Sequence, residues 1–293
     1  MGIPASKVYA WEERLGKENQ HNANLPRQHR LRSWERRAIL DYQTQHLETG
    51  YRQLTYMMLD ADVVAASPSS VYRVLKSDNR MGTKAVKSQR KGEGFHQPSR
   101  AHVHWHIDLS YLNISGTLCY LCSILDGYSR HIVHWEIRES MKEADVETVL
   151  QRARERYPKA TPRIISDNGP QFMARDFKTF IRQSGMTHVR TSPYYPQSNG
   201  KIERWHGTLK RECIRPKTPL NVDDARRVVG RYVRHYNEER LHAGIGYVAP
   251  VDRLEGRDEA VWRNRYRELA LAKATRRDGR HMPSRATVRP AVS

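Results

Sequence analysis

Three acidic residues lie where the surrounding sequence would bring their carboxylates together: Asp108, Asp167 and Glu203. Asp108 lies within an alternating apolar segment, Asp167 ends a second one, and Glu203 lies in a later helical segment. Clustered carboxylates repel one another unless a divalent cation neutralises them, and hard oxygen ligands suit Mg²⁺ or Mn²⁺. Two such ions, about 3.5–4 Å apart, activate the attacking oxygen and stabilise the leaving oxygen of a phosphodiester. The pattern therefore indicates metal-dependent phosphoryl transfer without a covalent protein nucleophile.

The segments that must position these carboxylates predict an α/β domain over residues 101–255. Val103, Trp105, Ile107 and Leu109 alternate with polar residues, which is the period-two pattern of a strand. Further strands are expected at 117–125, 131–137, 163–166 and 187–191, and helices at 142–157, 174–183, 200–212 and 221–237. This order predicts a mixed five-stranded sheet flanked by helices, beginning with an antiparallel meander. The first and fourth strands must be neighbours if the two aspartates are to lie side by side.

Composition restricts the classes of protein and partner. The chain has 293 residues with 38% apolar content, enough for one packed domain and smaller modules. A net charge of +19 favours nucleic acid as a partner. The longest apolar stretch, residues 118–125, is far shorter than the ~20 residues that span a bilayer, and residues 1–10 lack a signal core. No membrane partner is expected, and the expected location is the cytoplasm.

Residues 1–77 predict a small helical domain. Ser67 is a good N-cap and Pro68 a good first helical residue, so a helix is expected to begin there. Earlier helices are expected at 34–47 and 51–59. Two short helices joined by a turn, the second carrying Arg73 and Lys76, match a helix-turn-helix that places its second helix in a DNA groove. The alternative is a plain helical hairpin that docks on the core.

Two basic segments flank the predicted α/β domain. Residues 78–100 contain glycines, a proline and several Lys and Arg but few apolar residues, which predicts a linker. This linker is either a solvated tether or a segment that follows a phosphate backbone. Residues 256–293 predict a helix followed by a disordered basic extension, which would add salt-sensitive affinity for DNA.

Three motifs make the class of protein specific: SDNGPQF at 166–172, SPYYPQSNGKIER at 192–204 and YNEERLH at 236–242. They resemble the integrase (DDE) catalytic core of bacterial insertion-sequence transposases, and retroviral integrases are more distant relatives. The resemblance covers about residues 101–254. It implies a ribonuclease H-like fold in which Asp108, Asp167 and Glu203 are the catalytic metal ligands.

The resemblance also implies a reaction in two steps. The enzyme hydrolyses a bond at the end of its own mobile element, and the freed 3′-hydroxyl then attacks another phosphodiester. The implied partners are double-stranded DNA of the element ends and the target, further copies of the chain, and a DNA-binding protein encoded in an upstream reading frame. Two alternatives remain open: a catalytically silent DNA-binding regulator, and a metal-dependent nuclease that cuts without joining.

Several residues are candidates for contact with DNA. His206 and Lys210 share the helical face of Glu203, and related integrases contact DNA with a basic residue at this spacing. Two tyrosines in a proline-bounded loop could stack on bases or pack in the core, and an asparagine could orient Asp167, contact DNA or serve only as turn chemistry. The complete set comprises Lys210, His206, Arg204, Tyr194, Tyr195, Asn168, Arg73 and Lys76.

Two features depart from the retroviral pattern or fall outside it. The first 100 residues contain no cysteine, so the amino-terminal zinc module of retroviral integrases is not expected. His102, His104 and His106 are predicted to share the face of Asp108, where they would lie near DNA or bind a softer metal. Cys119 and Cys122 fall in a strand and should point to opposite faces, which predicts buried apolar residues and no zinc knuckle.

Overall fold

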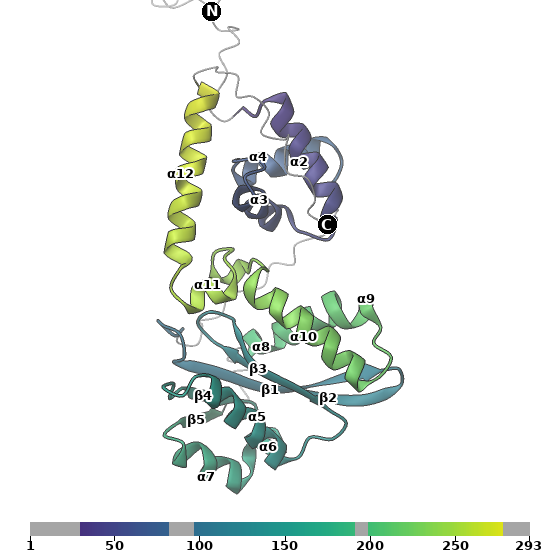
Figure 1. Cartoon of the computed structure of the whole chain (residues 1–293), viewed down its shortest axis with the longest axis vertical. Coiled ribbons are helices and arrows are strands. Elements are labelled where there is room, and N and C mark those ends of the chain that lie inside the picture. The colour runs from purple at the N-terminus through teal and green to yellow at the C-terminus, as the bar shows by residue number, and fades with distance from the viewer. Residues whose placement is uncertain (1–29, 82–96, 191–198, 278–293) are drawn as a thin grey trace, which may run out of the picture.

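The computed structural model describes residues 30–81, 97–190 and 199–277. The predictions for Tyr194 and Tyr195, for most of the basic linker and for the end of the tail lie outside these residues. Two lobes are visible in Figure 1, a helical lobe formed by the first helices and an α/β lobe built on one sheet. Within the described residues, no helix combines the length and apolar character that a membrane crossing requires.

A five-stranded mixed sheet forms the centre of the α/β lobe. Its strands are β1 (His104–Ile114), β2 (Thr117–Asp126), β3 (Ile132–Arg138), β4 (Arg163–Ser166) and β5 (Thr187–Arg190). They lie in the order β3-β2-β1-β4-β5, with β1, β2 and β3 antiparallel and β4 parallel to both β1 and β5. The predicted mixed five-stranded sheet, its opening meander and the pairing of the first and fourth strands are all confirmed.

Helices cover both faces of this sheet, and each face has its own apolar core (Figure 1). One face packs against α5 (Glu143–Arg156), α6 (Pro170–Met173) and α7 (Arg175–Gln183), and the other against α8 (Gly200–Leu209) and α10 (Val222–Glu238). Cys119 belongs to the α8 and α10 core, whereas Cys122 belongs to the α5 core. The prediction that these two cysteines point to opposite faces is confirmed.

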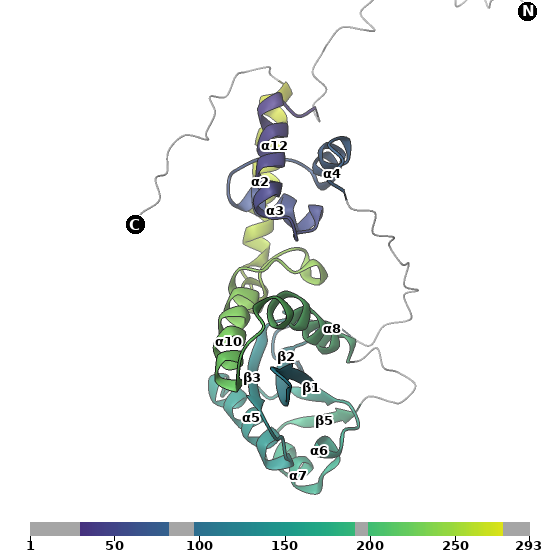
Figure 2. The same ribbon diagram turned by 90° about the vertical axis from the view of Figure 1, so that its right-hand side faces the viewer.

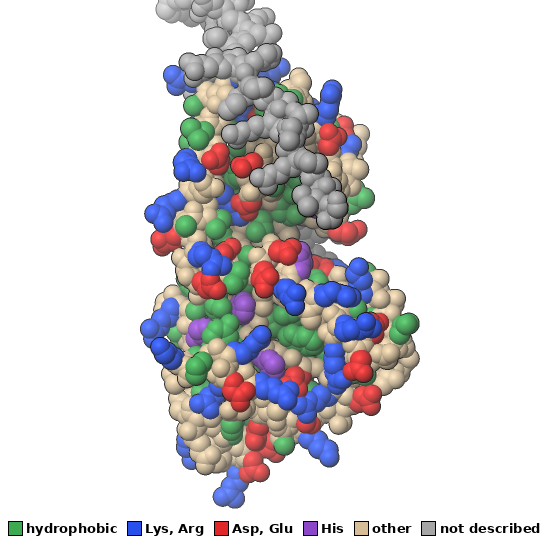
Figure 3. Space-filling view, in the orientation of Figure 1, with side chains coloured by type: hydrophobic (Ala, Val, Ile, Leu, Met, Phe, Trp, Pro, Cys, Tyr) green, Lys and Arg blue, Asp and Glu red, His purple; other side chains and the backbone are tan. Residues whose placement is uncertain are grey.

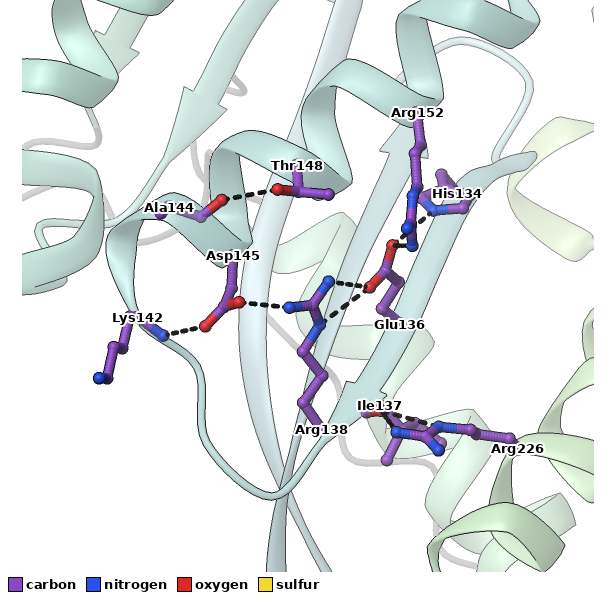
Figure 4. A network of polar contacts seen from close by, with 10 residues as sticks. All are labelled: His134, Glu136, Ile137, Arg138, Lys142, Ala144, Asp145, Thr148, Arg152 and Arg226. Atoms are coloured by element: carbon purple, nitrogen blue, oxygen red, sulfur yellow. Dashed lines mark hydrogen bonds and ion pairs between the residues drawn. The ribbon is translucent and has the colours of Figure 1, made fainter.

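The edge strand β3 is covered by charged side chains (Figure 4). Glu136 accepts hydrogen bonds from Arg138, with 2.7 Å between Oε2 and Nη2, and from Arg152 of α5. Arg138 also pairs with Asp145 of α5. From the other face, Arg226 of α10 donates two hydrogen bonds to the carbonyl of Ile137, at 3.1 and 2.9 Å. Charged groups of this kind protect an exposed strand from pairing with another chain.

The helical lobe contains α2 (Ser33–Gln45), α3 (Tyr51–Asp60) and α4 (Pro68–Ser77) around a small apolar core. Ser67 caps α4 as predicted, because its hydroxyl accepts the amide hydrogen of Ser70 at 3.3 Å. Pro68 occupies the first turn of that helix. The two short helices joined by a turn are therefore present.

Helix α12 (Asp258–Arg277) follows the short α11 (Pro250–Leu254) and runs along the helical lobe, as both Figure 1 and Figure 2 show. Arg276 pairs with Glu35 in a buried contact, with 2.7 Å between Nη2 and Oε1. Arg265 pairs with Asp60 at 2.6 Å. The first part of the predicted basic extension is thus a helix that holds the helical lobe.

Two local features differ from the expected elements. The helix predicted at 200–212 is α-helical only to Leu209 and continues as a π-helical turn, Lys210–Ile214, and as α9 (Arg215–Lys217). The short α6 was not expected, because its four residues are too few to show a helical period. A π-helical turn within a longer helix changes the direction in which the following side chains point.

Candidate active site

Asp108 and Asp167 lie on adjacent parallel strands. In β1, the even-numbered residues Leu112 and Ile114 point into the core formed with α8 and α10, so Asp108 points to the same face. His106 pairs with Ile165 across β1 and β4, and the same register carried two residues further places Asp108 level with Asp167. Strand order and register therefore bring the two predicted aspartates together.

Glu203 approaches both aspartates from α8. Partial burial and then the negative charge of Asp108 raise the pKa of Glu203, a neighbouring histidine opposes this, and Asp167 raises the pKa further. The contributions of Asp108 and Asp167 to this shift mean that both carboxylates lie within electrostatic range of Glu203. Since Glu203 and Asp167 are exposed and Asp108 is 9% exposed, the cluster lies at the surface.

The turn after β4 holds Asp167 in a defined position. Its Oδ1 accepts the amide hydrogen of Gly169 at 2.9 Å, which is the Asx turn expected of an Asp-Asn-Gly sequence. A Cβ atom at position 169 would lie 3.1 Å from that oxygen, so a larger residue would crowd the carboxylate. One step before, the buried Ser166 shares a hydrogen bond with His188 of β5 at 2.8 Å.

The three carboxylates have the donor chemistry that a divalent cation prefers. As they stand, however, no group of three or more His, Cys, Asp or Glu among the described residues is arranged so that it could hold a metal ion. Asp108, Asp167 and Glu203 supply oxygen donors, and burial together with the charges of the two aspartates raises the pKa of Glu203. Hard cations such as Mg²⁺ take carboxylate oxygens and keep several water ligands, so an open site with two exposed carboxylates suits them.

Two predicted residues of α8 lie beside Asp108. His206 is 6% exposed, and its Nδ1 lies 3.4 Å from Oδ2 of Asp108. Burial and the positive charge of Arg215 lower the pKa of Lys210, whereas the negative charge of Asp108 raises it. Lys210 therefore lies within electrostatic range of the carboxylates. Contact of either residue with DNA stays a prediction.

The other predicted DNA contacts lie at different places on the chain, and Tyr194 and Tyr195 lie outside the described residues. Arg204 is exposed on α8 and lies near His242, because burial and then the charges of three arginines, Arg204 among them, lower the pKa of His242 to about 4. Asn168 is exposed in the turn after Asp167. Arg73 and Lys76 are exposed on α4, far along the chain in the helical lobe.

The histidine array differs from the prediction. His102 precedes β1 with a φ of 60° and accepts the indole hydrogen of Trp105, which belongs to the opposite face of the sheet. His104 and His106 do share the face of Asp108, but they are 3% and 0% exposed. Burial and the nearby charge of Lys201 lower the pKa of His106 to about 3, so its ring is neutral. In this position His106 does not reach DNA.

Sequence reasoning missed the contacts that hold α8 in place. Trp205 is 1% exposed, donates its indole hydrogen to the Ser123 hydroxyl at 3.2 Å, and meets the Tyr236 ring edge-on at 4.6 Å.

The turn between β2 and β3 also contacts α8, because Lys201 donates to the carbonyl of Gly127 at 2.8 Å. A Cβ atom at Gly127 would lie 2.9 Å from His106, so only glycine allows the β2–β3 turn to lie this close to β1.

The motif YNEERLH attaches the π-helical turn that follows α8 to α10. Arg240 donates two hydrogen bonds to Glu212, both at 2.9 Å, and Tyr232 donates a third at 2.7 Å. Asn237 accepts the Ile132 amide hydrogen at 2.9 Å and donates to the Ile132 carbonyl at 3.1 Å, as a neighbouring strand would. The residues of this motif therefore support the site indirectly, because they hold the segment after α8 and strand β3 in position.

Replacing Glu212 by Gln should reduce stability in a pH-dependent way. Burial alone would raise the pKa of Glu212, but hydrogen bonds from Arg240 and Tyr232 outweigh it and lower this pKa from 4.5 to about 2. A lowered pKa stabilises the fold above pH 4.5, and this contribution disappears as the pH falls from 4.5 towards 2. We expect a loss of about 1–3 kcal/mol at pH 7, because hydrogen bonds to a charged group are lost.

Thermal melting at pH 7, 4.5 and 3 checks this prediction. The difference between wild type and the variant should shrink as the pH falls, while the exposed Glu238→Gln serves as the matched control. An equal difference at all three pH values would contradict the assignment of Glu212.

The fold and site define a ribonuclease H-like protein with a surface cluster of three carboxylates. Comparison with known families agrees: the profile described as integrase core domain matches residues 98–196, and a second profile of the same description matches residues 184–250. An insertion element IS136 protein of Agrobacterium fabrum is 30% identical over 174 residues, which are 57% of this chain and 89% of that protein. The chain therefore belongs to the integrase core family, which bacterial insertion-sequence transposases share with retroviral integrases.

Other relatives are similar over part of their length. The 39.2 kDa protein of insertion element IS476 from Xanthomonas euvesicatoria is 26% identical over 212 residues, covering 70% of this chain and 60% of that protein. The transposase for insertion sequence element IS904 from Lactococcus lactis is 27% identical over 150 residues, covering 50% of this chain and 59% of that protein. The chain thus spans about three fifths of these two relatives.

A solved structure shows the same fold. A chain in the structure of the simian T-cell lymphotropic virus intasome, determined with the PP2A regulatory subunit B56 gamma, superimposes with a TM-score of 0.50. The superposition covers 74% of each chain at 17% sequence identity. At this level of sequence identity, the superposition supports a shared fold alone.

Proposed function

We propose that the chain is a transposase of the polynucleotidyl transferase class, which cuts DNA at the ends of a mobile element and joins the freed ends to a target. The observation that carries this proposal is the strand register that places Asp108 level with Asp167, with Glu203 on the helix whose His206 lies 3.4 Å from Asp108. Membership of the integrase core family supports it. One such site serves both reactions, because only the nucleophile changes, from water to a 3′-hydroxyl.

Asp108, Asp167 and Glu203 are the proposed ligands of one or two divalent ions, Mg²⁺ or Mn²⁺. When bound, these ions lower the pKa of the attacking hydroxyl group and neutralise charge on the leaving oxygen. The chain orients the ligands: His206 lies against Asp108, and the Gly169 amide fixes one oxygen of Asp167.

Lys210 is the proposed phosphate contact beside the metal ligands. Its charge lies within range of Asp108, and its partial burial reduces the mobility of the side chain. A cation in this position would hold the phosphate next to the reactive bond and offset its negative charge. Arg73 and Lys76 on α4 are proposed as contacts of the helical lobe with DNA, since both are exposed on the second helix of its hairpin.

The proposed assembly contains several copies of this chain on two element ends, as joining two ends to one target requires. A DNA-binding protein from an upstream reading frame is a further proposed partner, and the proposed location is the cytoplasm, at the nucleoid. The space-filling view shows Lys and Arg side chains spread over the α/β lobe (Figure 3), which suits a polyanionic partner.

An oligonucleotide assay tests the proposal. A duplex carrying the terminal inverted repeat of the element is incubated with the protein, Mg²⁺ and a labelled target duplex. We expect nicked ends and, later, longer products in which the 3′ end is joined to the target. Cleavage without joined products would favour a nuclease, and binding without cleavage would favour a regulator; either result contradicts the proposal.

A further inference from the structure

A recess of about 720 Å³ lies at the end of the sheet opposite the carboxylates. It is formed by the segment that leads into β1, the first residues of β4 and β5, and the loop that follows α5. Arg163 begins β4, whereas Asp167 follows the last residue of the same strand. The recess is therefore a second concave surface, separate from the carboxylate cluster.

Positive charge in this recess is not neutralised. Four of the lining residues are Arg or Lys, and none is Asp or Glu. Arg100, Lys159 and Arg163 are exposed, and within the described part of the chain none of them forms an ion pair. Arg156 is partly used, because it donates to the Val133 carbonyl at 3.0 Å. Most surface arginines of the neighbouring β3 edge, by contrast, are paired with carboxylates.

Two nearby negative features do not cancel this charge. The carboxyl-terminal end of α5 points toward the recess and carries a partial charge of roughly −0.5. The buried Asp126 accepts the His102 amide hydrogen at 2.8 Å and also binds the turn that follows it, so it is already satisfied. The three positive charges of Arg100, Lys159 and Arg163 exceed the negative charge of Asp126 and of the helix end together, so the recess keeps a net positive charge.

The recess also offers an apolar surface. The rings of Tyr157 and His102 lie 4.3 Å apart, and both side chains are only partly buried. Pro158 and Val103 extend this surface. Cations around flat apolar side chains suit a ligand with repeated phosphates joined by sugars, because the phosphates meet the cations while the sugars pack on the rings.

We propose that this recess binds backbone phosphates of the DNA that flanks the reactive bond. The inference rests on the proposed function and assigns a second contact to the same substrate. Arg163 and Asp167 are four residues apart along one strand, which corresponds to about 13 Å. At 3.4 Å per base pair, this distance is about four base pairs of duplex. The distance between the recess and the carboxylates, measured along β4, is therefore no longer than a short duplex segment.

The test compares DNA affinity across a salt series without divalent metal, so that no strand is cut. We expect Lys159→Ala/Arg163→Ala to raise the Kd for duplex DNA by roughly 3- to 30-fold. The slope of log K against log salt should fall by about 2, because two phosphate contacts are lost. The charge-conserving Lys159→Arg/Arg163→Lys should retain the affinity and slope of the wild type.

Arg231→Ala/Arg234→Ala on α10 is the matched control, since it also removes two exposed cations that have no ion pair in the described residues. An equal loss of affinity in both alanine variants would show an effect of total charge and would contradict the proposal that the recess binds DNA. The proposal would also be contradicted if Lys159→Ala/Arg163→Ala bound DNA as tightly as the wild type, or if Lys159→Arg/Arg163→Lys lost affinity. A wild-type protein that fails to bind DNA would contradict the proposed function itself. Melting temperatures of all variants confirm that each one folds.

Discussion

Asp167→Asn is expected to abolish metal-dependent cleavage while leaving DNA binding intact. The amide keeps the size of the side chain and an Oδ1 that can accept the Gly169 hydrogen, so the turn after β4 should persist. The negative charge that holds a cation is lost. Since metal ions contribute several kcal/mol to such reactions, we expect the rate to fall by about a thousandfold or more.

Single-turnover cleavage of an element-end duplex, with DNA binding measured in parallel, checks this expectation. Asp176→Asn is the matched control, because Asp176 is exposed at the start of α7 and takes no part in the carboxylate cluster. Cleavage by Asp167→Asn within tenfold of the wild-type rate would contradict the site assignment, whatever the effect on binding.

Trp205→Ala should cause the largest loss of stability. The change removes a side chain that is 1% exposed, leaves the fully buried Ser123 hydroxyl without its donor, and removes the edge-on contact with Tyr236. Large-to-small changes of a buried aromatic residue cost about 3–5 kcal/mol. Because Trp205 lies two residues after Glu203 on the same helix, the loss should also loosen the position of that carboxylate.

Chemical denaturation measures this loss directly, and two further variants separate its causes. Trp205→Phe keeps an aromatic ring but loses the hydrogen bond, so it should cost about 1–3 kcal/mol. Trp34→Ala removes a tryptophan that is 42% exposed and should change stability much less. If Trp205→Ala were no more destabilising than Trp34→Ala, the role of Trp205 as an anchor would be wrong.

The features predicted correctly depend on short-range patterns. Alternation around Asp108 identified a strand, and Ser67-Pro68 identified a helix start. Each pattern spans a few residues, and the backbone geometry that it reports is local. The placement of the two aspartates followed from strand order, because parallel strands end at the same edge of a sheet.

The features that escaped prediction depend on contacts between distant segments. His106 looked like an exposed edge residue, but its burial depends on Gly127 in a turn and on Lys201 in another helix. The pairing of Glu212 with Arg240 joins residues 28 positions apart. Nothing in the spacing of charges indicates which arginine a given glutamate will meet, since that is decided by packing of the whole lobe.

The pairing of Glu35 with Arg276 has a consequence for the order of events on the ribosome. The two residues are 241 positions apart, so at about 5–20 residues per second roughly 10–50 s pass between their synthesis. During that time α12 does not yet exist, so the Glu35 carboxylate lacks the arginine with which it pairs in the folded protein. The helical lobe can therefore reach its final packing only after the α/β lobe and α12 have been made.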